Sequence, residues 1–116
     1  QLWLEAAALA RELETLHGIA RALLANEGGP LHDPEAALRM LEPVLRHTEA
    51  GRDCLPCHAT WGEALLAAGR PDEARTVLTE ALARAERRDA ETVERRVAAL
   101  LARLPGAGEI LASAGR

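Results

Sequence analysis

The sequence predicts an all-α domain in which helical hairpins stack as a solenoid, with about two repeats and a single helix at each end. Apolar residues recur every three to four positions along most of the 116-residue chain, which is the spacing of one buried helix face. A self-comparison indicates a repeat, because PEAALRMLEPVL at 34–45 aligns with PDEARTVLTEAL at 71–82. No stretch of useful length alternates apolar and polar residues, so no β-strand is expected.

The first three helices are expected at residues 2–14, 16–27 and 34–49. The apolar stripe of the second consists of Leu16, Ile19, Ala20, Leu23 and Leu24. Glycine and proline at 28–30 end that helix, and Asp33-Pro34 supplies an N-cap candidate and a first-turn proline for the next. Pro43 is expected to kink the third helix, because proline lacks a backbone donor and crowds the preceding turn.

The last three helices are expected at residues 56–68, 71–88 and 90–104. Gly69 and Pro71 separate the first two, Asp89 is an N-cap candidate for the third, and Pro105-Gly106 ends it. We therefore expect one domain over residues 1–106, with repeats at about 16–49 and 55–88 and an end helix at 90–104. Residues 107–116 are expected to form a flexible tail.

One segment carries a family resemblance. In WGEALLAAGRPDEARTVLTEALARAE, residues 61–86, each of two successive segments has a large residue between two small ones. These residues are Gly62, Leu65 and Gly69 in the first segment, and Ala74, Leu78 and Ala81 in the second. This pattern resembles the tetratricopeptide repeat, which implies a right-handed solenoid whose first helices line a concave face. The small residues let two helices approach and the large ones fill the groove. Residues 5–25 resemble the join between repeats in large bacterial regulators, which implies a bacterial regulatory protein larger than this chain.

Composition excludes some partners. The formal charge is −4 and no basic cluster dominates, which argues against nucleic acid. No apolar run approaches the ~20 residues of a membrane span, and we expect a cytoplasmic location without membrane contact. The chain begins at Gln1 rather than Met, which suggests a piece cut from a longer protein.

The stretch CLPCH at 54–58 is the strongest chemical motif. Cys54, Cys57 and His58 match the attachment motif of c-type haem, and they could instead supply part of a zinc site. A C-x-x-C at a helix N-terminus can also act as a redox dithiol, because the helix dipole favours the thiolate. A structural disulfide is a further alternative. The interpretation we favour here is two small, semi-buried cysteines that pack beneath a loop, with no cofactor and no metal.

No set of nucleophile, base and acid emerges from the sequence, so we expect a non-catalytic protein–protein interaction module rather than an enzyme. The partner would be a protein or peptide, or another domain of the same chain. By position in the tetratricopeptide pattern, the resemblance implies a partner-binding face made of Ala59, Glu63, Leu66, Ala67 and Arg70.

Overall fold

The computed structural model describes residues 2–104, with side chains described for residue 8 and for 11–104. Over this range the chain is all-α, and its helices are α1 (Leu2–Leu24), α2 (Pro34–His47), α3 (Glu49–Asp53), α4 (Leu55–Ala67), α5 (Pro71–Arg87) and α6 (Glu91–Leu101). The expected tail at 107–116 and the expected stop at Pro105-Gly106 lie outside the described residues. Within residues 2–104 no helix is both long enough and apolar enough to cross a membrane.

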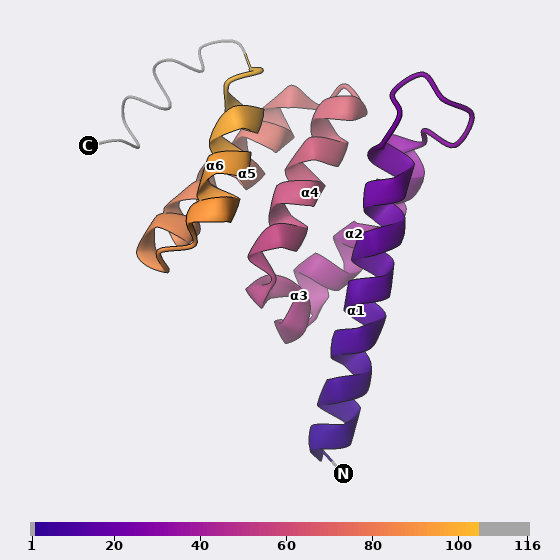
Figure 1. Ribbon diagram of the computed structural model, residues 1–116, viewed down its shortest axis with the longest axis vertical. Coiled ribbons are helices and arrows are strands. Elements are labelled where there is room, and N and C mark those ends of the chain that lie inside the picture. The colour runs from indigo at the N-terminus through magenta and orange to yellow at the C-terminus, as the bar shows by residue number, and fades with distance from the viewer. Residues whose placement is uncertain (1, 105–116) are drawn as a thin grey trace.

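Neighbouring helices pack in chain order. Figure 1 shows α1, α4 and α6 as a front layer, with α2 and α5 behind them. The contacts agree, because α2 packs between α1 and α4, α5 packs between α4 and α6, and α4 touches both α1 and α6. This order places one row of helices along one face of the molecule, which we call the inner face (α1, α4 and α6).

The N-terminal region differs from the prediction. Two helices were expected at 2–14 and 16–27, but α1 runs without interruption from Leu2 to Leu24. Thr15 does not break the helix, because its hydroxyl donates to the carbonyl of Arg11 (3.1 Å) within the same helix. Gly18 also lies inside α1, on its exposed side. The chain leaves the helix only before Asn26 and Gly28, which both adopt positive φ.

The third predicted helix, 34–49, is divided in two. Its start is confirmed, because Asp33 caps α2 by accepting from the Ala36 amide (3.0 Å) and Pro34 is in the first turn. Its end is wrong, because α2 stops at His47 and the short helix α3 follows. Thr48 makes the division, since its hydroxyl donates to Val44 O (2.7 Å) and accepts from the Gly51 amide (2.9 Å).

The turns after α4 and α5 share one hydrogen-bond pattern. After α4, Gly69 (φ 77°) donates to Leu66 O and Arg70 donates to Leu65 O, the pairing of a Schellman motif. After α5, Asp89 (φ 51°) and Ala90 repeat it with Glu86 O and Ala85 O. Asp89 therefore ends α5 and does not cap α6 as expected; the N-cap position is Ala90, with no side-chain cap.

The core lies between the two layers. It is formed mainly by leucine and alanine, and its fully buried leucines are Leu38, Leu41, Leu45, Leu65, Leu78 and Leu101. Gly62 of α4 faces the side chain of Leu78 of α5 so closely that a Cβ atom at position 62 would lie 2.2 Å from Leu78 Cδ2. The predicted close crossing of these two helices, with a small residue against a large one, is confirmed.

Candidate functional site

Cys54 and Cys57 form a disulfide at the junction of α3 and α4. The free, packed cysteines that we favoured from the sequence are therefore not what the structure contains. Cys54 is the N-cap residue of α4, and its Sγ accepts from the Cys57 amide (3.2 Å). Pro56 lies in the first turn of this helix. Cys54 is partly exposed, whereas Cys57 is 1% exposed.

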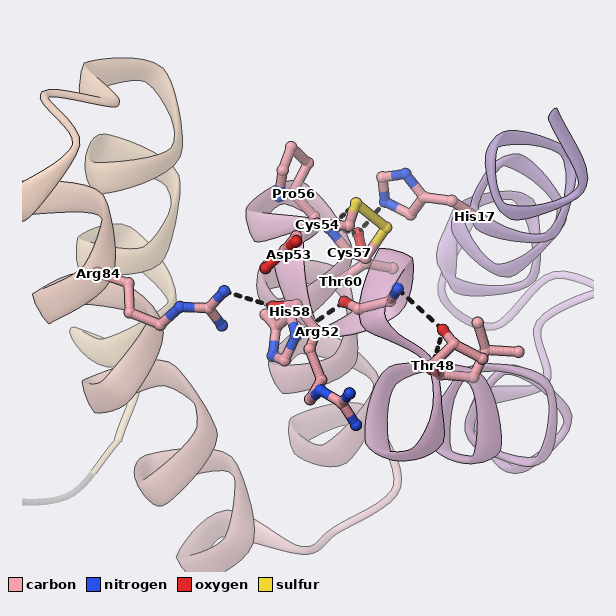
Figure 2. The surroundings of a disulfide bond; sticks show 12 residues. His17, Thr48, Arg52, Asp53, Cys54, Pro56, Cys57, His58, Thr60 and Arg84 are labelled. Atoms are coloured by element: carbon pink, nitrogen blue, oxygen red, sulfur yellow. Dashed lines mark hydrogen bonds between the residues drawn. A yellow bond between two sulfur atoms is a disulfide. The ribbon is translucent and has the colours of Figure 1, made fainter. Parts of the chain in front are cut away.

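Three arginine side chains, from α5, from the residue that caps its C-terminus and from α6, hold the backbone around this disulfide. Arg84 of α5 donates to Arg52 O, Arg88 donates to Asp53 O (3.4 Å), and Arg96 of α6 donates to Pro56 O (3.3 Å). Figure 2 shows Arg84 reaching from α5 toward Arg52. Three guanidinium groups therefore contact the backbone of residues 52–56, which flanks and includes the two cysteines, and Asp53 is the adjacent acidic residue.

A polar network crosses the inner face beside the disulfide. Thr60 of α4 is fully buried, and its Oγ lies 2.6 Å from His17 Nε2 of α1 and 2.9 Å from Arg96 Nη2 of α6. Arg96 also pairs with Glu63 (2.9 Å). Three helices that are far apart in sequence are thus joined by one buried hydroxyl, and Figure 2 places His17 next to the disulfide.

The electrostatics of this network favour a neutral His17. Burial, then the guanidinium groups of Arg96 and Arg21, lower the pKa of His17 below its ordinary value of 6.5. Thr60 has one hydroxyl proton and two possible acceptors, Pro56 O (3.1 Å) and His17 Nε2. A neutral imidazole suits both arrangements, because its Nε2 can either donate or accept.

The surroundings of His58 also favour a neutral imidazole. Burial and then Arg84 lower its pKa, while hydrogen bonds to backbone carbonyls and Glu80 act in the opposite direction. Its Nε2 donates to Gly51 O (3.1 Å), which ties α4 to α3. The imidazole also meets the ring of Trp61 edge-on, with centroids 5.6 Å apart.

We expect the free energy of unfolding to fall as the pH drops from about 7.5 to about 5.5. His17 and His58 take up protons near pH 6.5 when unfolded but only at lower pH when folded. Between these values the unfolded chain binds more protons, so acid favours unfolding. From about pH 7.5 upward the histidines are neutral in both states and the effect disappears.

Urea unfolding at the two pH values measures this dependence. His17→Gln, which keeps a donor toward Thr60, should reduce the difference, and His17→Gln with His58→Gln should reduce it further. If the free energy of unfolding still differed between the two pH values as much in the double variant as in the original chain, His17 and His58 would not be the cause.

A pocket of about 360 Å³ lies on the other side of α4, between α2 and α5. It is lined by Arg46, His58, Trp61, Glu73, Thr76, Val77 and Glu80. The guanidinium of Arg46 lies 5.2 Å from the centroid of the Trp61 ring, a cation–π contact. Trp61 is largely buried, and its indole N–H has no hydrogen-bond partner among the described residues.

The five residues predicted to bind a partner differ in how far they are exposed. Ala59 is fully buried and Leu66 is half-buried against the core. Arg70 turns toward α2 and α5, where it pairs with Glu42 (3.7 Å) and Glu73 (2.7 Å). Only Glu63 and Ala67 remain on the open side of α4.

One side of α4 runs through Pro56, Thr60, Glu63 and Ala67. Pro56 and Ala67 are exposed at its ends, whereas Thr60 is fully buried in contact with His17 and Arg96. Sequence reasoning missed His17, Thr60 and Arg96 as members of this face. The partners of Thr60 lie 43 and 36 positions away along the chain, so no local spacing could reveal them.

The metal and haem alternatives for CLPCH gain no geometric support. In the disulfide neither sulfur is available for a thioether bond or a metal, and His58 Nε2 is directed at Gly51 O. Among the described residues, no group of three or more His, Cys, Asp or Glu side chains is placed to hold a metal ion.

Comparison with known proteins finds no matching family model, no matching curated protein and no matching solved structure.

Proposed function

We propose that this chain is a tetratricopeptide-like interaction module whose inner face binds a protein or peptide. The order of helix contacts supports the proposal, because each helix packs on its chain neighbours and α4 bridges α1 and α6. The repeated turn after α4 and α5 adds support, since stacked hairpins need the same change of direction at each step. The module would belong to a larger bacterial regulatory protein.

The observation that carries the choice of face is the polar network on α1, α4 and α6. His17, Thr60, Glu63 and Arg96 draw the three helices together through side chains rather than through a closed apolar contact. Pro56 and Ala67 are exposed at either end of this row on α4. A row of small and polar groups suits a partner that presents both apolar and polar side chains. One apolar side chain of the partner would pack near Ala67, and its polar groups would lie beside Glu63 and Arg96.

An Ala67→Glu exchange tests the face. Ala67 is exposed, one turn after Glu63 on the same side of α4, so a charged side chain there should block a docked partner without disturbing the core. We expect pull-down of a partner identified with the unmodified chain to fall by about tenfold or more, which corresponds to a loss of about 1.4 kcal/mol or more in binding free energy. Unfolding in urea should be unchanged.

The matched control is Ala83→Glu, which makes the same exchange at an exposed alanine of α5, in the outer layer. This variant should retain the partner. If Ala67→Glu and Ala83→Glu captured the partner equally well, the inner face would not be the binding surface. Loss of capture with Ala83→Glu alone would move the binding surface to the outer layer.

A further inference from the structure

The two sulfur atoms of the disulfide differ in access. Cys54 is partly exposed at the N-cap of α4, and Cys57 is 1% exposed in the first turn of that helix. Cys54 is therefore the residue of the pair that a thiol from solution can approach, whereas Cys57 is covered. This asymmetry assigns one attacked sulfur and one leaving sulfur.

The surroundings favour negative charge on sulfur. The Cys57 amide donates to Cys54 Sγ (3.2 Å), and α4 points its N-terminus at the pair. Arg84 of α5, Arg88 at its C-cap and Arg96 of α6 bring guanidinium groups to the backbone oxygens of Arg52, Asp53 and Pro56. Amide donors and guanidinium groups stabilise a thiolate over a thiol, and a stabilised thiolate both leaves and attacks at neutral pH.

We propose that Cys54 and Cys57 form a reversible dithiol–disulfide site that exchanges with low-molecular-weight or protein thiols through Cys54. This site goes beyond the interaction function and does not require the inner-face partner. The pair at the junction of α3 and α4 would be oxidised or reduced according to the balance of thiols and disulfides around the protein.

The exchange balances in two steps. An incoming thiolate attacks Cys54 Sγ, the bond between the two sulfurs breaks, and Cys57 leaves as a thiolate that takes up a proton. A second thiolate then attacks the outer sulfur of the mixed disulfide, and Cys54 leaves and is protonated. Two electrons and two protons pass to the chain, and the two incoming thiols become one disulfide. Oxidation by a disulfide runs through the same steps in reverse.

Single-cysteine variants test which sulfur exchanges. In Cys57→Ser, oxidised glutathione should attach at Cys54, as shown by mass spectrometry of the intact chain and its peptides. In Cys54→Ser, attachment at Cys57 should be about tenfold slower or more, because that sulfur is covered. Equal rates at the two positions would overturn the proposal.

The oxidised, unmodified chain is then equilibrated with mixtures of reduced and oxidised glutathione, and free thiols are alkylated and counted. We expect a two-thiol transition within the accessible range of mixtures, and a rate that does not change in low concentrations of urea. A disulfide that stays closed in excess reduced glutathione, or that opens only as urea unfolds the chain, is a permanent structural bond and would overturn the proposal.

A matched arginine pair tests the electrostatic contribution. Arg84→Gln removes the guanidinium that donates to Arg52 O, whereas Arg87→Gln removes an exposed guanidinium on the same helix. Arg84→Gln should slow alkylation of Cys54 in the reduced chain by about threefold, the scale of one nearby charge at a partly exposed site. Arg87→Gln should leave the rate unchanged. An equal effect of both variants would show that these arginines do not act on Cys54.

Discussion

Replacing Gly62 with leucine is expected to lower the free energy of unfolding by about 3 kcal/mol or more, the upper end of the usual cost of overpacking a core. A Cβ atom at this position would lie 2.2 Å from Cδ2 and 2.4 Å from Cγ of Leu78, which is itself fully buried. Neither side chain can turn toward solvent, so α4 and α5 would have to separate. Urea unfolding of the purified chain measures the loss.

A double-mutant cycle shows whether Leu78 is the cause. Leu78→Ala alone should cost about 2–5 kcal/mol, because it leaves a cavity in the core. Gly62→Ala should be destabilising in the unmodified chain, yet harmless or favourable beside Leu78→Ala, with a coupling of about 1–3 kcal/mol. Gly18→Ala is the control, because a Cβ at this exposed position in α1 meets no atom within 4 Å. Additive effects at positions 62 and 78 would contradict the close crossing.

The sequence predicts the fold best where the signals are local. The ranges expected for α4, α5 and α6 agree with the structure to within three residues at each end, because apolar periodicity and the punctuation at Gly69-Arg70-Pro71 act within one turn. Asp33 and Pro34 likewise identify the start of α2. Local chemistry therefore fixes most helices and their order.

The errors arise where one local signal has two meanings. Thr15 interrupts the apolar pattern but bonds within α1 and leaves the helix intact, whereas Thr48 bonds to both sides and ends α2. Asp89 is a good N-cap residue by type, yet it takes a left-handed conformation that closes α5. The role of each residue depends on how the following helix packs in the fold. The residues next to it in the sequence do not determine that packing.

The candidate site was only partly predictable. The spacing of Cys54 and Cys57 in CLPCH showed that a disulfide was one of several options, and the structure selects it. The arginines around it come from α5, its C-cap and α6, more than thirty positions later in the chain. Because the fold alone brings them together, neither the charge around the sulfurs nor the network at Thr60 could be inferred beforehand.

Gly51→Ala is expected to lower the free energy of unfolding by about 1–3 kcal/mol or more. We expect that a second substitution at Val44 does not restore the lost stability. A Cβ at position 51 would lie 2.2 Å from Val44 O and 2.8 Å from both Val44 C and Thr48 Oγ. Two of these three atoms are backbone, so α3 would have to move away from the end of α2. That movement would stretch the Thr48 bridge to the Gly51 amide and the bond from His58 to Gly51 O.

Urea unfolding of Gly51→Ala, with and without Val44→Ala, distinguishes this crossing from the one at Gly62. At Gly62 the obstacle is a side chain, and truncating Leu78 should restore much of the stability. At Gly51 the obstacle is the Val44 carbonyl, which remains in every variant, so Val44→Ala should add its own cost and rescue nothing. If Gly51→Ala were as stable as the original chain, α3 would not be held against α2 as described, and the division of 34–53 into two helices would lose its physical basis.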